Sequence, residues 1–283
     1  ENKIRIVEAW QRKGKVVSMT GDGVNDAPAL KKADIGVAMG ITGTEVSKDA
    51  AAMILTDDNF ATIIKAVCNG RNVYRNIKNA IQFLLSGNMA GILAVLYCCV
   101  AGLPAPFAAV HLLFINLLTD SLPALAIGME SVDERLLQDT PRDPSEKLLN
   151  SSFIRNMLIY GSMIAAVTIT AFYLGDPVHT VQTAMTMAFA TLTLARLFHG
   201  FNLRSKYSLV RIGLCSNRWS IAAFGVGVLL LVLVLCIPAA RSAFAASSLT
   251  GAQTASVAIL AGLPTIIIQG FRILRERLSG TDR

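Results

Sequence analysis

The stretch Asn116-Leu117-Leu118-Thr119-Asp120 lies inside an apolar run at residues 107–129, and it decides the fold class of the chain. An ionised carboxylate near the middle of a lipid bilayer costs about 2.5 kcal/mol or more, so Asp120 needs a compensating partner or a functional reason to be there. On an α-helix, Asn116 and Asp120 share one face, with Thr119 beside them. That face offers oxygen atoms, which are the ligands that a hard cation such as Ca²⁺ requires. The stretch therefore predicts a cation site within a membrane.

Two interpretations of these polar residues are open. Asn116 and Thr119 could join helices through hydrogen bonds worth under about 2 kcal/mol each, with no cation involved. A formal charge is a poor way to make such a neutral contact, so Asp120 favours the cation site. Pro123 adds to this preference, because it has no N–H to donate to the carbonyl of residue 119 and leaves backbone oxygens there as further ligands.

The composition of the chain excludes an ordinary soluble protein of this length. Of 283 residues, 53% are hydrophobic and 16% are charged, and the mean hydropathy is +0.52. The net charge of +7 does not indicate a nucleic-acid binder, because the basic residues gather in loops that flank apolar runs. The five cysteines show no disulfide or metal-ligand spacing. The chain starts at Glu1 without an initiator Met, so we expect a piece of a longer protein.

Six apolar segments are each close to the roughly 20 residues that span a bilayer as a helix. They lie at about residues 80–103, 107–129, 153–174, 180–201, 219–240 and 252–271. Basic residues follow the second, fourth and sixth segments, whereas the opposite connections hold only Arg241. By the positive-inside rule, this predicts a multi-pass protein of the cell membrane whose N-terminal piece and C-terminus are cytoplasmic.

Residues 1–58 alternate between helical and strand patterns, which predicts a partial α/β domain with a parallel sheet. The expected strands are residues 16–19, 35–39 and 53–55. From residue 59, apolar positions recur at helical spacing. Residues 59–79 are thus expected to form a helical stalk, capped by Asp57 and Asp58, that continues into a transmembrane domain at residues 80–283.

The loop Thr20-Gly21-Asp22-Gly23-Val24-Asn25-Asp26-Ala27-Pro28 follows the first expected strand and carries a second chemical signal. In folds with a parallel sheet, ligands bind at the carboxyl ends of the strands. Gly21 and Gly23 let the backbone approach a phosphate, and the aspartates can hold Mg²⁺ through oxygen or water. The same residue types form turns, and Asp26 could simply cap a helix, but the whole string favours a phosphate and magnesium site.

The string from Thr20 to Leu30 resembles the hinge signature of P-type ATPases, and residues 116–124 resemble an ion-site helix of the calcium-pump branch of that family. The resemblance covers nearly the whole chain. It implies the C-terminal half of a haloacid dehalogenase-like, Rossmann-like phosphorylation domain, followed by an all-α bundle with the last six transmembrane helices of the pump. It also implies ATP-driven Ca²⁺ export through an aspartyl-phosphate intermediate, with ATP as substrate and Mg²⁺ as cofactor. The implied partners are the lipid bilayer and the N-terminal section of the same pump.

The resemblance assigns roles to individual residues. Asp22 matches the carboxylate that holds Mg²⁺, while Asn25 and Asp26 match residues that stabilise the phosphorylated site. Lys3 matches the lysine that contacts the transferred phosphoryl group. The matched ligands of the transported cation are Asn88, Asn116, Thr119 and Asp120.

The sequence departs from two-ion calcium pumps at two positions, because Gly91 and Arg196 stand where those pumps have glutamates. We hypothesise that the guanidinium of Arg196 occupies the lost site as a built-in counter-charge near Asp120, which leaves one transported ion per cycle. In the alternative, Arg196 extends toward the end of its helix, where His199 lies.

Several motifs of the complete pump are not in this sequence. It contains no Asp-Lys-Thr-Gly, Thr-Gly-Glu or Pro-Glu-Gly-Leu string, so we expect the chain alone to be inactive. Two alternatives to a calcium pump stay open. One is transport of Mn²⁺ or another cation, and the other is a truncated, non-catalytic membrane protein that binds a cation or a partner.

Overall fold

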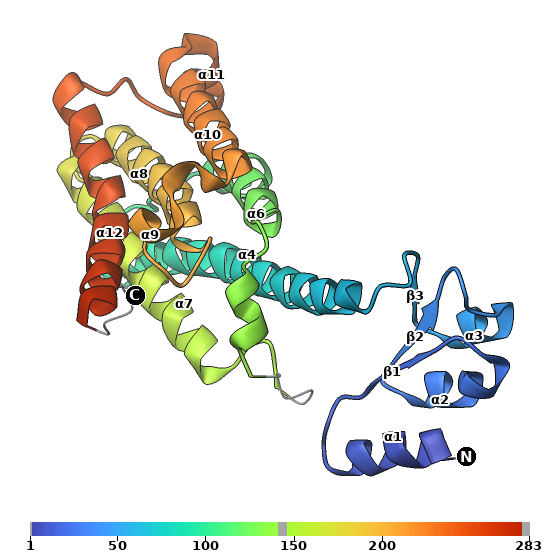
Figure 1. The fold of residues 1–283 in the computed structure, drawn as a ribbon. Helices are drawn as coiled ribbons and strands as arrows, with labels where there is room; N and C mark the ends of the chain where they lie inside the picture. Colours follow the sequence, from blue (N-terminus) through green and yellow to red (C-terminus); the bar gives the residue numbers. More distant parts are fainter. Residues whose placement is uncertain (1, 141–145, 279–283) are drawn as a thin grey trace. The chain divides into compact units, whose positions relative to one another are not determined.

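The protein is described by a computed structural model that covers residues 2–140 and 146–278 (Figure 1). The chain divides into two compact units. The first comprises the residues up to Arg71 together with Glu134–Gln138, which form a 3₁₀ turn. The second comprises Asn72–Asp133 together with the residues from Asp139 onward.

A three-stranded parallel sheet with the strand order β1-β2-β3 forms the centre of the first unit. β2 is the middle strand, and its residues from Gly36 to Met39 are buried, as expected for a strand covered on both faces. The elements of this unit are α1 (Asn2–Arg12), β1 (Ser18–Gly21), a 3₁₀ turn (Val24–Asp26), α2 (Ala27–Lys32), β2 (Ile35–Met39), α3 (Glu45–Ala50) and β3 (Met53–Leu55).

The strands predicted at residues 35–39 and 53–55 are confirmed. The first strand begins at Ser18 and not at residue 16. Its start is displaced because the N–H of Val17 bonds to a carboxylate oxygen of Asp34 at 2.8 Å and not to the neighbouring strand. The displacement moves the carboxyl end of β1 to Gly21, directly against the glycine-rich loop.

A single helix of 41 residues, α4 (Phe60–Val100), confirms that the stalk continues into an apolar segment without a break. Asn59 caps its start, because its Oδ1 accepts a hydrogen bond from the N–H of Ala61 at 2.9 Å. Asp57, which the sequence predicted as a cap, is not the cap, but it supports this turn by accepting from the N–H of Asn59 at 3.2 Å and from Thr62 Oγ1 at 2.7 Å.

Asp58 does not cap α4, so that part of the prediction is wrong. Its backbone has a left-handed φ of 48°, which turns the side chain away from the helix and toward the loop at Gly40–Thr42. There its carboxylate accepts hydrogen bonds from the N–H groups of Gly40 (2.6 Å), Ile41 (3.0 Å) and Thr42 (2.8 Å). Hydrogen bonds from these amides, that of Ile41 first, lower the pKa of Asp58 to about 2.

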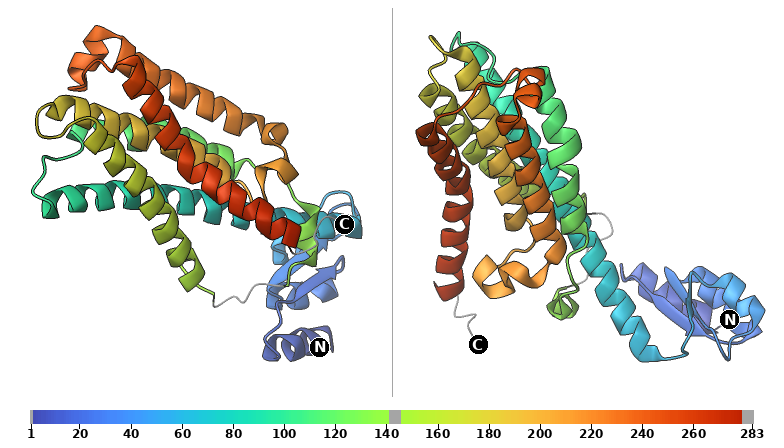
Figure 2. Two further views of the ribbon diagram at one scale, coloured as in Figure 1. Left: turned by 90° about the vertical axis from the view of Figure 1, so that its left-hand side faces the viewer. Right: turned by 90° about the horizontal axis from the view of Figure 1, so that it is seen from above.

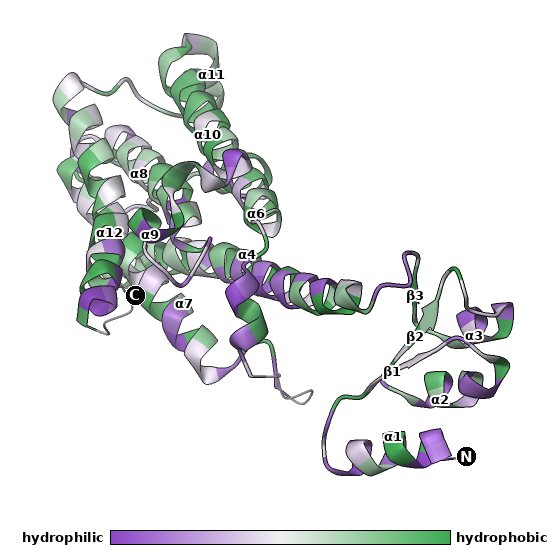
Figure 3. Cartoon of the chain, in the orientation of Figure 1, coloured by the Kyte–Doolittle hydropathy of each residue, from purple (hydrophilic) through white to green (hydrophobic). Residues whose placement is uncertain are grey.

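Among the described residues, five helical segments are long and apolar enough to cross a membrane. They are α4, the segment Ala109–Gly128, α7 (Ser151–Leu174), α10 (Arg218–Cys236) and α12 (Gly251–Leu278). Figure 2 shows the bundle from two further sides, and Figure 3 shows the hydrophobic residues along its helices. α9 (Leu209–Ile212) and a 3₁₀ turn (Leu214–Ser216) precede α10, and α11 (Pro238–Ala243) follows it. The chain is therefore a multi-pass membrane protein.

Helix α8 (Val181–Asn202) occupies the fourth predicted membrane segment, yet it is not among these five apolar segments. It packs against α7, α10 and α12, and most of its residues from Thr186 onward are buried. Because protein surrounds this helix, it can carry Arg196 and His199 without exposing them to lipid. Five of the six predicted apolar spans are confirmed, and the remaining one is a buried helix of mixed polarity.

Candidate functional site

The segment around Asp120 is not one regular α-helix. α5 (Ala109–Phe114) passes into a π-helical turn (Ile115–Thr119), and α6 (Ser121–Gly128) follows. The N–H of Asp120 donates to the carbonyl of Ile115 at 2.9 Å, which is the i to i+5 bond of a π-turn. Such single π-turns are frequent at functional sites.

The π-turn separates two residues that the sequence placed on one face. Asn116 is exposed, whereas Asp120 is only 1% exposed. The prediction of a shared face is wrong, because the spacing argument assumes α-helical geometry and a π-turn adds a residue to the turn between them. Thr119 stays on the buried side with Asp120, and its hydroxyl donates to the carbonyl of Ile115 at 3.0 Å.

Three side chains from three helices meet at Asp120. Arg196 Nη2 of α8 bonds to Asp120 Oδ2, and the same nitrogen donates to Asn88 Oδ1 of α4 at 3.1 Å. Both members of the ion pair are buried. Arg196 thus points at Asp120 and Asn88 within the bundle, and the alternative in which it extends to the end of its helix is excluded.

A glycine in α4 makes room for the guanidinium group. A Cβ atom at Gly87 would lie 2.6 Å from Cζ of Arg196, which no real contact between such atoms allows. One turn later, a Cβ atom at Gly91 would lie 4.0 Å from Leu192 Cδ2, an ordinary contact. Gly87 therefore permits the approach of Arg196 to Asn88 and Asp120.

The pair is incompletely satisfied. Within the described part of the chain, Asp120 Oδ1 and Arg196 Nε are buried and have no hydrogen-bond partner. Leaving a buried polar atom unpaired costs about 1–3 kcal/mol, and more for a charged group. The described residues contain no cluster of three or more His, Cys, Asp or Glu side chains, so a cation here would be held by one carboxylate and by neutral oxygens.

The glycine-rich loop lies at the carboxyl end of β1, as predicted. Lys3 Nζ bonds to Asp26 Oδ1 at 2.5 Å, and Asp26 Oδ2 accepts from the N–H groups of Asp22 (3.3 Å) and Gly23 (3.4 Å). The hydrogen bond from Lys3 is the main reason that the pKa of Asp26 lies below its usual range. Gly21 lies against this carboxylate, since a Cβ atom there would be 2.8 Å from Asp26 Oδ2. The carboxylate of Asp26 therefore links Lys3 to the backbone of the glycine-rich loop.

Asp22 and Asn25 present their side chains to solvent on the same loop. The carbonyl of Asp22 is fixed from behind by the N–H of Thr44 at 2.8 Å and by Ser47 Oγ at 3.0 Å. Ser47 is completely buried. Sequence reasoning missed these two supports, although Thr44 and Ser47 have the spacing of a helix cap, and Thr44 does cap α3.

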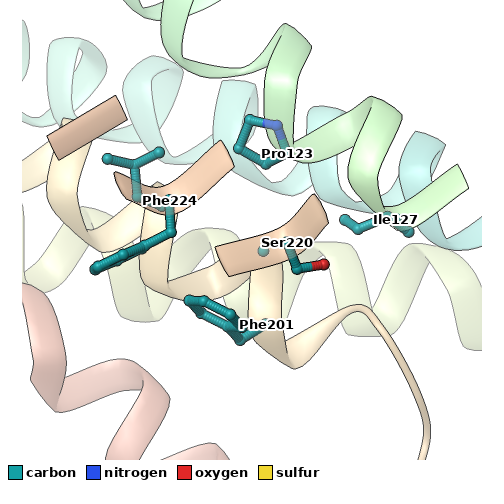
Figure 4. A pocket seen from close by; sticks show the side chains of 7 residues that line it. Pro123, Ile127, Phe201, Ser220 and Phe224 are labelled. Atoms are coloured by element: carbon teal, nitrogen blue, oxygen red, sulfur yellow. The ribbon is translucent and has the colours of Figure 1, made fainter. Parts of the chain in front are cut away.

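A small apolar pocket lies between α6, α8 and α10 (Figure 4). Its lining residues are Pro123, Ile127, Leu197, Gly200, Phe201, Ser220 and Phe224. Ser220 supplies the sole side-chain oxygen among them, so this pocket has too few ligands for a cation.

Residues 104–274, which are more than half of the chain, match the family described as cation transporting ATPase, C-terminus. The chain belongs to this family. Its curated relatives include a calcium-transporting ATPase of Bacillus cereus (40% identical, covering 98% of this chain and 33% of the relative) and one of Listeria monocytogenes (45% identical, covering 95% and 30%). The human calcium-transporting ATPase type 2C member 1 is 36% identical, over 99% of this chain and 32% of its own length.

These comparisons confirm the resemblance to the C-terminal section of a calcium pump that the two motifs indicated. The chain spans about a third of the length of the curated relatives it matches.

Proposed function

We propose that this chain is part of an ATP-driven pump that exports Ca²⁺ through an aspartyl-phosphate intermediate. The observation that carries the proposal is the buried carboxylate of Asp120, whose Oδ1 has no hydrogen-bond partner in the described part of the chain. A buried carboxylate oxygen without a partner is costly, and binding of a cation removes that cost. The names of the relatives support Ca²⁺ as the cation.

In this proposal the transported Ca²⁺ is held by Asp120 with oxygens from Thr119 and Asn88, which lie beside it on the buried side of the π-turn and on α4. Asn88 is exposed, but its Oδ1 accepts from Arg196 Nη2 at 3.1 Å beside Asp120. Asn116 is exposed and has no such contact among the described residues, so it remains a candidate ligand through the family resemblance alone. Thr119 and the carbonyl oxygens around the π-turn supply neutral ligands, as Ca²⁺ sites commonly do.

Arg196 is proposed to act as a built-in counter-charge, so that one Ca²⁺ is transported in each cycle. Its guanidinium bonds to Asp120 Oδ2 and Asn88 Oδ1, so these oxygens are not free for a second cation, while Asp120 Oδ1 has no partner in the described part of the chain. A fixed positive charge at this place disfavours a second divalent cation by direct repulsion. A full-length pump that moves two Ca²⁺ for each ATP hydrolysed would contradict this assignment.

Residues 1–58, which are part of the first unit, are proposed to be the C-terminal half of a haloacid dehalogenase-like phosphorylation domain, joined by a stalk at 59–79 to a transmembrane domain at 80–283. The three-stranded parallel sheet is consistent with this assignment, and the proposal also places the unit and the C-terminus in the cytoplasm. ATP would be bound mainly by other parts of the pump. Lys3, Asn25 and Asp26 would face the transferred phosphoryl group, which approaches the backbone at Gly21 and Gly23.

The loop after β1 fits a magnesium ion. Asp22 offers an exposed carboxylate on a backbone fixed by Thr44 and Ser47, whereas the carboxylate of Asp26 is occupied by Lys3. Mg²⁺ typically takes one or two carboxylates and completes its shell with water and phosphate oxygens. When bound, the ion neutralises charge on the phosphoryl group in transfer. Asp22 would hold it.

The test is phosphoenzyme formation from labelled ATP, with this chain joined to the upstream section of a calcium-transporting relative. We expect Ca²⁺-dependent labelling, and we expect Asp120→Asn to raise the Ca²⁺ concentration for half-maximal labelling more than about 100-fold, as a loss of about 3 kcal/mol in cation binding implies. Asp176→Asn is the matched control, because it removes the same charge from an exposed turn. Absence of labelling in the joined protein would indicate a non-catalytic membrane protein, and labelling that requires Mn²⁺ in place of Ca²⁺ would change the cargo.

A further inference from the structure

The loop between α8 and α10 is fixed to the end of α12 by hydrogen bonds. Ser208 donates from its N–H (2.7 Å) and its hydroxyl (2.6 Å) to the carboxylate of Glu276. The N–H of Leu209 donates to Gln269 Oε1 at 2.8 Å, and Arg272 donates to the carbonyl of Ser205 at 2.8 Å. Figure 1 shows α9, which belongs to this loop, beside α12. We call residues 205–219 together with 269–278 the basic platform.

The basic platform carries an excess of exposed positive charge. Between Leu203 and Trp219 the sequence has no Asp or Glu. Arg204 is neutralised by Glu130, but the exposed side chains of Lys206, Arg211 and Arg218 have no ion pair among the described residues. Glu276 is the one carboxylate within the platform, and both of its oxygens accept hydrogen bonds from Ser208.

Two of these cations share one aromatic ring. Lys206 Nζ lies 5.4 Å, and Arg211 Cζ lies 4.8 Å, from the ring centroid of Tyr207. Attraction to the ring stabilises both cations beside Tyr207 although their charges repel. A phosphate group bound by both would relieve that repulsion and accept charge-assisted hydrogen bonds from both.

Exposed apolar side chains also belong to the loop that carries these cations. Val210, on α9, is 81% exposed, and Trp219 begins the apolar stretch of α10. A Trp at the end of a membrane-crossing helix, next to basic residues in the sequence, is typical of segments that lie at the bilayer interface.

We propose that the basic platform binds the headgroup of an anionic phospholipid, with the lipid phosphate between Lys206 and Arg211. The exposed apolar residues lie next to helices that cross the membrane, which favours a lipid over a soluble anion. Each basic residue near an anionic surface strengthens binding roughly fivefold. This site is separate from the proposed transport site, and its test requires neither ATP nor Ca²⁺.

The experiment uses Trp219 as the reporter. The chain has two tryptophans, so Trp10→Phe leaves Trp219 as the single source of Trp emission. The full chain is placed in phosphatidylcholine vesicles that contain a minor fraction of the anionic lipid phosphatidylglycerol. Bromine atoms quench Trp emission. In one sample the phosphatidylglycerol is brominated, and in the other the same mole fraction of phosphatidylcholine is brominated. We expect stronger quenching by the brominated anionic lipid, and a roughly fivefold loss of this preference in Arg211→Gln.

Arg241→Gln is the matched control, because it removes the same charge beyond the opposite end of α10. It should leave the preference unchanged. Raising the salt to about 1 M, where the Debye length is about 3 Å, should remove most of the preference. Equal quenching by the two brominated lipids, or an equal loss in both arginine variants, would overturn the proposal. A further outcome is that inorganic phosphate abolishes the preference while chloride at the same ionic strength does not. That result would assign the site to a soluble anion instead of a lipid.

Discussion

Arg196 in α8 and Arg204 just beyond its end are both buried, and each reaches a carboxylate contributed by α6 or the residues next to it. Arg196 pairs with Asp120, and Arg204 pairs with Glu130. The two pairs therefore join the same two parts of the bundle with the same chemical groups. What differs is how completely the surrounding protein satisfies them.

The pair of Arg204 and Glu130 is fully supported by its neighbours. Arg204 Nε and Nη2 each lie 2.9 Å from one oxygen of Glu130, which is the bidentate geometry of strong pairs. Arg204 also donates to the carbonyl of Leu214 at 2.9 Å and to Ser216 Oγ at 2.6 Å. Asn217 Nδ2 donates to Glu130 Oε2 at 2.8 Å. Such a pair fixes the end of α6 to the loop before α10.

The pair of Arg196 and Asp120 has fewer partners. Asn88 is its one further hydrogen-bond partner among the described residues, and Asp120 Oδ1 and Arg196 Nε have none there. Buried polar atoms in proteins are normally paired, and an exception needs an explanation such as a ligand. The comparison teaches that burial and charge alone do not separate the two pairs, whereas incomplete satisfaction singles out Asp120, the residue that we propose holds the transported cation.

The largest effect is expected from Arg204→Met. Removing one partner of a buried, satisfied pair leaves Glu130 uncompensated and should lower the free energy of unfolding by about 3–5 kcal/mol. Equilibrium unfolding in mixed detergent micelles measures this. Arg155→Met, which removes an exposed arginine near the start of α7, should stay within about 0.5 kcal/mol of the unchanged protein. Ca²⁺ should not restore the stability of Arg204→Met, because the carboxylate left unpaired is that of Glu130, which lies outside the proposed cation site.

Arg196→Met should behave differently from Arg204→Met. The loss of the guanidinium exposes Asp120 as an unpaired carboxylate, and Ca²⁺ can take the place of the lost charge there. Without Ca²⁺ we expect a destabilisation of about 2–4 kcal/mol, and saturating Ca²⁺ should recover about 1–3 kcal/mol of it by binding to the folded state alone. The same unfolding assay, run with and without Ca²⁺, checks this. If Ca²⁺ changes Arg196→Met no more than Arg204→Met, the two pairs are of one kind and the proposed transport site is wrong.

A smaller effect is expected from the glycines beside Arg196. Gly87→Ala places a Cβ against the guanidinium and should destabilise the protein by about 1–3 kcal/mol through overpacking. Gly91→Ala has the room for its Cβ, so it should stabilise α4 by about 0.5–1 kcal/mol, as alanine normally does in a helix. Because both substitutions replace Gly by Ala in the same helix, the gain in helix propensity is the same. A stability change of opposite sign at Gly87 would therefore be due to its contact with Arg196. Equal signs would mean that Gly87 does not position this arginine.

The sequence predicts the helices of the bundle well, because the periodicity and length of apolar runs are local properties. It also predicts the loop after β1, whose residues are contiguous. The π-turn was not predicted, since the bond between Asp120 and Ile115 depends on how the neighbouring helices take up the extra residue. The pair of Arg204 and Glu130 was missed because its members are 74 residues apart, and no spacing rule connects them. The approach of Arg196 to Asp120 was anticipated through the family resemblance and not from the residues themselves.

The smallest effect concerns Asp58, a third carboxylate, which backbone amides satisfy in place of an arginine. Its pKa in the folded protein is lowered to about 2, below the value of about 3.9 in an unfolded chain. A carboxylate whose pKa is lower in the folded protein stabilises the fold at every pH above its pKa in the unfolded chain. This stabilisation is lost as the pH falls through the pKa of the folded protein. The amides of Ile41 and Thr42 should therefore stay protected from hydrogen exchange at pH 4 and lose protection, corrected for intrinsic exchange rates, as the pH falls toward about 2. In Asp58→Ala their protection should be low at every pH, whereas protection in β2 should not change, because the carboxylate holds the loop and not the strand.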